Sequence, residues 1–599
     1  NTPIDEINPI KPEMKFYGTS STVSYLAQNP INVALGMGQF QEDHVEELYE
    51  EPYTPLTEPL PQFIQTEVTQ SLTAIAGTSF EGPGVGLAGF SLTGAPPDHT
   101  LAVGPDHIVA MVNSQMVIFD KSGNVLVSPI NINSLFTGVG GVCETTNRGD
   151  PILQYDRLAD RWILSQFAFS VSGGAPVAPY FQCFAVSTSA DPTSTYVRYT
   201  VQFSSTSPNG FNDYGKLGVW PDAYYTSYNI FGGSPAGSNT GAALCASDRV
   251  KMLAGDASAT TLCSPVGFYG GGASFLPADL DGITLPSDLT QGGIFMRAST
   301  SQNLRYLKLK PNFAAGTVTL TDGFGGANAS FVSLPTTILY ACNGSGGTCV
   351  SQPGTANLLD TLGSRLMYRL AFRNRDGVES LLVSHATDPD AGGAQVAAMR
   401  WYEILNPLGN PIDVNLANRP FIYQSGTYNP GASGNRWMGS IAMDKNGNIL
   451  MGYNVVNTGT GLKPSIAVAG RELNDPLNTL QSEIIAHTGT GSQTDTLTRW
   501  GDYSTMQVDP VDDLTFWYIG QYLSADGTFN WRTRIVSYKF PEPATLSIDD
   551  VNIVEGNSAT SIATFTITRS HADDEVSVEV DTLDDTAIVA QLIMPAVGR

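Results

Sequence analysis

Short β-rich runs that begin at an aspartate recur through the middle of the chain. They read DHIVAMVN (106–113), DRWILSQF (160–167), DAYYTSYN (222–229), DGVESLLVSH (376–385), DKNGNILMGYN (444–454) and DLTFWYIGQY (513–522). Successive runs start 54 to 69 residues apart, except for one interval of 154 residues. GGIFMRAST (292–300) supplies a further run inside that interval, which makes seven repeated units.

Strand-rich units at this spacing, without helical periodicity, are typical of sheets arranged radially around an axis. One four-stranded sheet cannot bury both of its faces, whereas seven around an axis bury them against one another. The sequence therefore predicts an all-β fold, a seven-bladed β-propeller over residues 86–541. A string of β-sandwiches is the alternative.

The two ends of the chain differ from the repeats in composition. QEDHVEELYEEPYTPLTEPLPQ (41–62) holds seven acids and four prolines, so residues 1–85 are predicted to form an extended acidic and proline-rich arm. Either its own domain or a neighbouring subunit would hold this arm in place. Residues 542–599 alternate apolar and polar side chains from PEPATLSIDD onward, which predicts part of a C-terminal β-sandwich.

Charge and hydropathy restrict the partners and the compartment. The 599 residues carry 30 Lys and Arg against 56 Asp and Glu, a net charge of −26, which argues against nucleic acid and anionic membranes as partners. There is no run of about 18 apolar residues, so no membrane span is expected. The opening NTPIDEINPIKPE fits an exported chain, extracellular or at the cell surface, whose signal peptide has been removed.

The six cysteines favour disulfides over a metal site, because their number is even and no C-x-x-C or His-rich cluster is present. We predict sequential pairing, namely Cys143 with Cys183, Cys245 with Cys263, and Cys342 with Cys349. The last pair is the safest prediction because CNGSGGTC is a Gly-rich loop that brings its ends together easily. A cytosolic chain with six buried thiols is the alternative.

Two resemblances to known families support these boundaries. Residues 85–540 resemble a family of secreted bacterial propeller proteins without an assigned activity, through PPDHTLAVGPDHIVAMVN (96–113), CETTNRGDPILQYDRLADRWILSQF (143–167), DYGKLGVWPDAYYTSYN (213–229), LGSRLMYRLAFRN (362–374), NRWMGSIAMDKNGN (435–448) and RWGDYSTMQVDPVDDLTFWY (499–518). After Phe540, the Val554-Glu555-Gly556 turn and the following strand that ends in Thr-Arg-Ser resemble the opening of a Calx-β domain. That resemblance implies that Glu555 is a calcium ligand.

Four aspartates precede predicted innermost strands, which would converge at one mouth of a propeller channel. They are Asp98, Asp150, Asp213 and Asp502. Carboxylates in such a ring could bind Ca²⁺, which takes six to eight oxygen ligands. The alternative is that they cap the backbone where each strand begins, as Asx turns do. The Asp-Gly and Asn-Gly turns elsewhere in the repeats are explained by hairpin geometry.

Catalytic motifs are missing from the sequence. No G-x-S-x-G, H-E-x-x-H or P-loop is present. His99 and His385 could act as general bases at blade ends, but a lone histidine is more often structural. The seven tryptophans are predicted to pack between blades, with stacking on sugar rings as the alternative. An acidic propeller also offers many carboxylate pairs of the kind that glycosidases use.

Two functions follow from this sequence. The first, which the sequence favours, is a secreted or cell-surface β-propeller that binds or assembles without catalysis, as an adhesion, matrix or filament protein with calcium as a stabilising ion. Its partners would be a glycan, another surface protein, or copies of itself through the termini. The second is an extracellular hydrolase or lyase acting on polysaccharide at the channel mouth.

Overall fold

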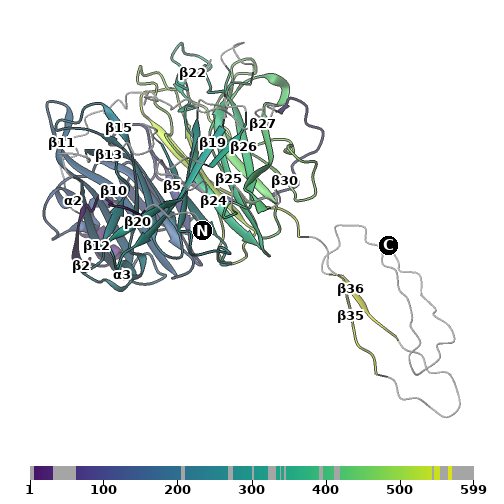
Figure 1. Cartoon of the computed structure of the whole chain (residues 1–599). Coiled ribbons are helices and arrows are strands. Elements are labelled where there is room, and N and C mark those ends of the chain that lie inside the picture. Colours follow the sequence, from purple (N-terminus) through teal and green to yellow (C-terminus); the bar gives the residue numbers. More distant parts are fainter. Residues whose placement is uncertain are drawn as a thin grey trace. The chain divides into compact units, whose positions relative to one another are not determined.

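A computed structural model describes most of the chain. The described residues are 6–30, 63–203, 210–266, 274–299, 303–321, 332–336, 339–342, 346–389, 396–409, 418–542, 546–552 and 564–569. They belong to two units, Asn1–Phe540 and Pro541–Arg599. The first unit is almost entirely β-structure, as predicted (Figure 1).

Four-stranded antiparallel meanders follow one another along the first unit (Figure 1). They are built from β5 (Thr100–Val103), β6 (His107–Val112), β7 (Gln115–Asp120) and β8 (Val125–Asn131); β9 (Gly149–Asp156), β10 (Arg161–Ser172), β11 (Ala175–Ser187) and β12 (Tyr196–Phe203); β13 (Phe211–Val219), β14 (Tyr224–Phe231), β15 (Asn239–Ser247) and β16 (Thr261–Cys263); β17 (Leu276–Asp281), β18 (Gly293–Ser299), β19 (Asn303–Asn312) and β20 (Thr317–Thr321); β24 (Met367–Arg375), β25 (Val378–Thr387), β26 (Ala398–Leu405) and β27 (Phe421–Tyr428); and β28 (Asn435–Met443), β29 (Ile449–Asn457), β30 (Leu462–Arg471) and β31 (Ile484–His487). A further sheet has the order β32 (Thr505–Val508), β33 (Phe516–Leu523), β34 (Trp531–Lys539) and β4 (Ile75–Glu81).

Each run quoted from the sequence coincides with the second strand of one sheet, namely β6, β10, β14, β18, β25, β29 and β33. The turns before these strands show why an acidic residue recurs there. Asp160, Asp376 and Asp513 have φ of 52°, 51° and 55°, a left-handed conformation that aspartate tolerates better than most residues. In the DKNGN turn, Asp444 accepts hydrogen bonds from the backbone N–H groups of Asn446 and Asn448, both at 2.9 Å. The interpretation of these turns as hairpin chemistry agrees with this geometry.

The first strands of the sheets contact one another in a closed order. β5 contacts β9, β9 contacts β13, β13 contacts β17, β17 contacts β24, β24 contacts β28, β28 contacts β32, and β32 returns to β5. β17 and β24 also pair in parallel, with Ala278 opposite Leu370. Because sheets arranged radially around a ring of first strands define a β-propeller, the structure has the predicted β-propeller fold.

Packing between neighbouring sheets supplies the core. All nine residues of β13 and all nine of β28 are buried, as expected for strands that are covered on both faces. The tryptophans are buried as well: Trp162, Trp437, Trp500 and Trp531 have no exposed surface, and Trp517 retains 3%. These side chains therefore fill the interior as predicted, and none is placed to stack on a sugar at the surface.

The N-terminal region contributes strands to the outer edges of the sheets. β4, from the range predicted as an arm, is the outermost strand beside β34 and joins the beginning of the chain to the last sheet. β1 (Glu6–Ile7) pairs with β20, β2 (Glu13–Thr19) pairs with β12, and β3 (Ile64–Gln65) pairs in parallel with β27. Of the two possibilities left open by the sequence, the chain's own propeller holds the described parts of this region. The acidic stretch 41–62 lies outside the described residues.

The three predicted disulfides are confirmed. Cys143, in α2 (Val142–Thr145), is bonded to Cys183 in β11. Cys245–Cys263 joins β15 to β16, and Cys342–Cys349 closes a short loop before β24. These bonds are typical of proteins outside the reducing cytosol and agree with an extracellular location. In the part of the chain that the structure describes, no helix is long and apolar enough to span a membrane.

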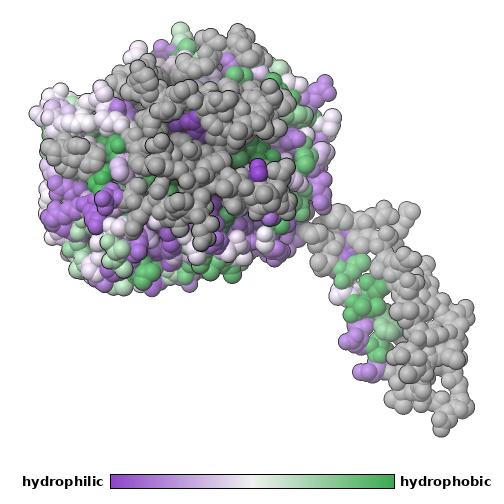
Figure 2. All heavy atoms as spheres, viewed as in Figure 1, coloured by the Kyte–Doolittle hydropathy of each residue, from purple (hydrophilic) through white to green (hydrophobic). Residues whose placement is uncertain are grey.

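The second unit is described over a single hairpin. β35 (Leu546–Ile548) pairs with β36 (Ile567–Arg569) in antiparallel register. Leu546, Ile548 and Ile567 are all exposed, and Figure 2 shows hydrophobic residues along this hairpin. Most residues of the predicted sandwich, including Glu555, lie outside the described residues.

A buried ion-pair cluster links three sheets in the interior of the ring. Arg369 on β24 donates to Asp279 and Asp281 on β17, with both N–O distances at 2.7 Å, and its Nε donates to the carbonyl oxygen of Met506 on β32. Burial raises the pKa of Asp279 to about 6, although Arg369 acts in the opposite direction. Because Arg369 is 1% exposed, water cannot replace it as the partner of the two carboxylates.

Replacing Arg369 by Met should lower the free energy of unfolding by about 3–5 kcal/mol, because two buried carboxylates would lose their partner. Urea denaturation followed by tryptophan fluorescence measures the loss. Lys463→Met, which breaks an exposed pair with Asp526, is the matched control and should leave the midpoint unchanged. Equal midpoints for the two variants would contradict this account of the cluster.

Candidate functional site

The aspartates singled out in the sequence lie where first strands begin. Asp98 precedes β5, Asp150 is the second residue of β9, Asp213 lies in β13, and Asp502 precedes β32. Since these strands contact one another around the ring, their starting ends lie at one mouth of the propeller. We call this region the mouth cluster: Asp98, Asp150, Asp213, Tyr214, Lys216, Arg365, Arg499, Asp502 and Tyr503.

Hydrogen bonds between sheets show how closely these strand starts approach. The backbone N–H of Tyr214 donates to Asp150 Oδ2 at 3.1 Å, and the Tyr214 hydroxyl donates to the carbonyl oxygen of Asp502 at 3.3 Å. The Tyr503 hydroxyl donates to the carbonyl oxygen of Pro151 at 2.9 Å. The N–H of Asp98 donates to the carbonyl oxygen of Gly501 at 3.1 Å. Residues about 350 positions apart in the chain thus share one site.

The backbone at these positions explains the choice of aspartate. Asp98, Asp150 and Asp502 have φ of 50°, 45° and 66°. Aspartate is enriched in this left-handed region because its short side chain forms local hydrogen bonds there. This conformation agrees with the alternative that the aspartates cap the backbone where the strands begin. Asp150 in addition accepts a hydrogen bond from the backbone N–H of Tyr214, in the neighbouring sheet.

Cations and aromatic rings surround the carboxylates. Lys216 Nζ lies 3.4 Å from the centre of the Tyr214 ring and 4.0 Å from that of Tyr503. The Arg365 guanidinium lies 4.6 Å from the Tyr214 ring centre. Cation–π contacts in buried surroundings are worth about 2 kcal/mol or more. The tyrosine rings therefore hold the Lys216 ammonium and the Arg365 guanidinium within the mouth cluster, and both groups keep their positive charge.

The carboxylates act together on Tyr503. The pKa of its hydroxyl is raised well above the ordinary value, mainly by burial and then by the negative charges of Asp98 and Asp150. Tyr503 therefore stays protonated and remains a hydrogen-bond donor. Asp502 is held differently, since it forms a buried ion pair with Arg499. Within the mouth cluster, Asp150 is only partly buried, whereas Asp98 and Asp502 are 2% and 3% exposed.

A second polar layer lies deeper between the first strands. Gln154 on β9 donates to the Tyr368 hydroxyl, which in turn donates to the carbonyl oxygen of Leu217 at 2.9 Å. Gln507 on β32 donates to Gln154 and accepts from the N–H of Val103 at 3.2 Å. These hydrogen bonds link five sheets across the ring interior, through residues of β5, β9, β13, β24 and β32.

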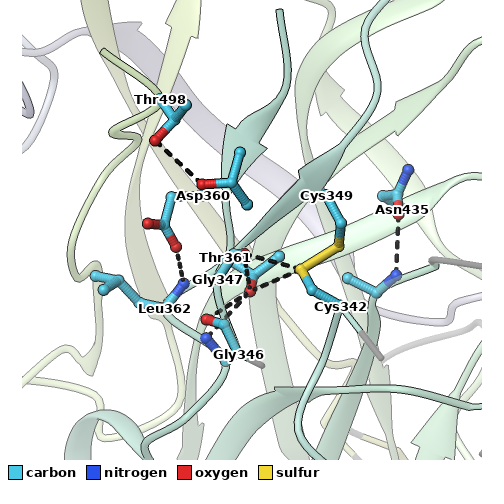
Figure 3. The surroundings of a disulfide bond; sticks show 12 residues. Cys342, Gly346, Gly347, Cys349, Asp360, Thr361, Leu362, Asn435 and Thr498 are labelled. Carbon is cyan, nitrogen blue, oxygen red and sulfur yellow. Dashed lines mark hydrogen bonds between the residues drawn. A yellow bond between two sulfur atoms is a disulfide. The ribbon is translucent and has the colours of Figure 1, made fainter. Parts of the chain in front are cut away.

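A disulfide-closed loop forms one side of the mouth. We call residues 339–342 and 346–366 the rim loop; it contains β22 (Thr348–Val350) and β23 (Leu359–Asp360) and ends at Arg365 and Leu366. Figure 3 shows Cys342–Cys349 beside Thr361, whose hydroxyl donates to the carbonyl oxygen of Gly347 at 2.9 Å. The N–H of Asp360 donates to the carbonyl oxygen of Thr498 at 2.8 Å, just before Arg499. The rim loop thus connects β24 to the segment that delivers Asp502.

The calcium prediction is not decided by this arrangement. Over the described ranges, no group of three or more His, Cys, Asp or Glu side chains is placed to hold a metal ion. Asp98, Asp150, Asp213 and Asp502 share the mouth, but Glu555 lies outside the described residues. Calcium binding by these five residues remains a prediction.

The two histidines considered as general bases are structural. Burial lowers the pKa of His99 to about 3. Burial also lowers the pKa of His385 to about 4, with a further lowering by the charge of Arg400, while the hydrogen bond with the Ala386 carbonyl opposes this shift. His385 Nε2 lies 3.1 Å from the Tyr402 hydroxyl, and the histidine is fully buried in its sheet. Both are neutral near pH 7 and neither is exposed.

Sequence reasoning missed the aromatic and basic members of the mouth cluster. A signal was present, because Asp213-Tyr214 and Asp502-Tyr503 repeat the dipeptide Asp-Tyr at equivalent strand starts. Lys216 follows two residues after the first of these tyrosines. Arg365 carries no comparable signal, since the rim loop that positions it has no counterpart in the other repeats.

Comparisons with known proteins give weak structural likenesses alone. No family model matches the sequence, and no curated protein matches it. A glycosyl hydrolase from Bacteroides ovatus is 12% identical, with 73% of this chain and 99% of that chain covered and a TM-score of 0.28. An exo-β-1,3-galactanase from Clostridium thermocellum is 9% identical, with 79% and 89% covered and a TM-score of 0.28. Drosophila Plexin A in complex with Semaphorin 1b is 8% identical, with 80% and 88% covered and a TM-score of 0.29. With TM-scores below 0.5, these likenesses carry no argument about activity.

Because His99 is buried, the free energy of unfolding should depend on pH. Below pH 6.5 the unfolded chain protonates this histidine while the folded chain does not until about pH 3, so stability is lost as the pH falls through that window. A His99→Leu variant lacks this loss. As the pH falls from 6.5 to 4, the free energy of unfolding of this variant should rise relative to that of the wild type by up to about 1.4 kcal/mol for each pH unit. Urea denaturation at several pH values measures the difference, and a difference that is constant with pH would contradict the assignment.

Proposed function

We propose that this chain is an extracellular β-propeller that cleaves glycosidic bonds of a polysaccharide, as a hydrolase or lyase, at the mouth cluster. The observation that supports this most is the placement of Asp98 and Asp150 at one mouth, where both act on the Tyr503 hydroxyl. Glycoside hydrolysis usually needs two carboxyl groups, one to protonate the leaving oxygen and one to activate water or attack the sugar. Of the two functions predicted from the sequence, we therefore favour the second.

The different exposure of the Asp98 and Asp150 carboxyl groups suggests a different role for each in cleavage. Asp150 is the partly exposed member and would contact the substrate from solvent, while Asp98 is almost fully buried beside it. Lys216 and Arg365 both hold positive charge against the ring of Tyr214, whose backbone N–H donates to Asp150. Such fixed charges favour an ionised carboxylate, which is the form that activates water or attacks the sugar.

A non-catalytic glycan-binding function is the second candidate. It is favoured by the engagement of the same carboxylates in structural contacts: Asp502 with Arg499, and Asp150 with the N–H of Tyr214. The two candidates differ in a single observable, because both bind a polysaccharide at the mouth but one alone releases products. Assembly through the termini, a cell-surface location and removal of a signal peptide remain predictions.

We also propose three finer structural features that the sequence predicts. A count of seven blades is supported by the closed order β5, β9, β13, β17, β24, β28 and β32. A Calx-β-like C-terminal unit is supported by one described hairpin, β35–β36. Calcium stabilisation is supported by the shared location of four aspartates, and a rise in melting temperature with Ca²⁺ that EDTA reverses would test it.

Replacing Asp150 by Asn should lower the rate of polysaccharide cleavage by about 10²–10⁴-fold, because one of two carboxyl groups would no longer transfer a proton. Reducing ends released from neutral and uronic-acid polysaccharides measure the rate. Asp376→Asn, at an exposed hairpin turn, is the matched control and should cleave like the wild type. A wild type that binds a polysaccharide without releasing ends would support the second candidate, and an Asp150→Asn variant with full activity would contradict the proposed site.

A further inference from the structure

The N-terminal segment follows the outer circumference of the propeller. We call residues 6–28 the belt. Glu6–Ile7 pairs with β20, and Ile10 exchanges two backbone hydrogen bonds with Cys263 of β16, at 2.9 and 2.8 Å. Glu13–Thr19 pairs with β12, and α1 (Val23–Gln28) contacts β8. The belt thus visits the outer edges of four consecutive sheets in reverse order.

Main-chain hydrogen bonds attach the belt along its length, and a few side chains add packing contacts. In β2 the side chains of Met14, Phe16 and Tyr17 are partly buried, and the centre of the Phe16 ring lies 5.4 Å from that of Tyr199 on β12. Arg198 on β12 adds contacts to backbone, donating to the carbonyl oxygens of Tyr17 at 2.8 Å and Thr19 at 3.1 Å. The buried side chains of α1 are Val23 and Leu26. Recognition through backbone groups is the chemistry of strand addition.

The acceptor surface consists of sheet edges. Without the belt, β12, β16 and β20 would present rows of N–H and C=O groups, which readily pair with another strand. The belt of a second copy carries the same groups in the same order. The acceptor edges therefore cannot distinguish the belt of their own chain from that of another copy by contacts.

Chain connectivity then decides which belt is bound. Residues 29–63 connect the belt to β3, and 35 residues can span about 115 Å when fully extended. A connection of this length allows the belt to bind its own chain or to reach a second copy, so the protein concentration decides which belt occupies an acceptor. The net charge of −26 opposes the approach of a second copy, and salt screens this repulsion.

We propose that the belt exchanges between copies, so that residues 6–28 of one chain add to the edges of β12, β16 and β20 of a second. The structure shows the form in which each chain holds its own belt. Exchange substitutes identical contacts and therefore needs little free energy beyond opening the belt. High protein concentration and high salt should favour it. This proposal is independent of what the mouth cluster does.

Introduced cysteines in the full chain test the exchange. Glu13 on the belt lies directly opposite Gln202 on β12. All native cysteines that the structure describes are in disulfides, so Glu13→Cys and Gln202→Cys introduce the sole free thiols. One sample carries both substitutions in one chain, and a second mixes two populations with one substitution each. After mild oxidation, non-reducing electrophoresis and peptide mapping distinguish links within a chain from links between chains.

Exchange predicts a covalent dimer in the mixture, increasing with protein concentration and with salt. As a control, Glu13→Cys is mixed with Val378→Cys, whose thiol would be exposed on β25 and would report random collision. A mixture that dimerises no more than this control, while the double variant links efficiently within its own chain, would overturn the proposal. A double variant that forms no link would overturn it too, because the β2–β12 pairing would then be wrong.

Discussion

The hydrogen bonds between β4 and β34 close the propeller. β4 comes from residues 75–81 and β34 from residues 531–539, so one antiparallel pairing joins the two ends of a chain segment more than 450 residues long. Each backbone hydrogen bond contributes only about 0.5–1.5 kcal/mol. Their joint effect is larger because they hold the last sheet in the ring, and the contact between β32 and β5 depends on that placement. Without ring closure, neither the core nor the mouth cluster would form.

Ring closure also explains why the mouth has unusual chemistry. It brings Asp98, Asp150 and Tyr503 together from the beginning and the end of the propeller sequence. Burial in such a place strengthens electrostatic interactions because water does not screen them. The cations of the cluster are held against aromatic rings, and the deeper layer around Gln154 and Arg369 is satisfied by its own partners.

Much of this fold could be predicted from the sequence. The aspartate-led runs became second strands because an Asp or Gly turn followed by an apolar run has one simple structural solution, a hairpin strand. Cysteine pairing followed sequence order because each pair joins segments that lie close together in the chain, as the 18-residue separation of Cys245 and Cys263 shows. The convergence of the aspartates followed from radial symmetry. All three predictions use local patterns that repeat.

The belt and the cationic part of the mouth could not be predicted in the same way. β1 and β3 are two residues long, and the burial of β2 does not alternate regularly, so no side-chain periodicity marks these strands. Lys216 and Arg365 acquire their roles from rings on other strands, and Arg365 depends on the rim loop, which occurs once. The roles of the belt, Lys216 and Arg365 can be recognised only from the three-dimensional arrangement of the strands around the ring. The sequence favoured binding without catalysis, because it contains many carboxylates and no pattern that identifies one pair of them as catalytic.

The location of the functional site is the central claim, and hydrogen–deuterium exchange of the whole protein with and without oligosaccharides measures it most directly. The account predicts slower exchange at the starts of β5, β9, β13 and β32, around Asp98, Asp150, Tyr214 and Asp502, with the hairpin turns at Asp376 and Asp444 unchanged. Protection at those turns or along the outer edges, with none at the strand starts, would contradict it.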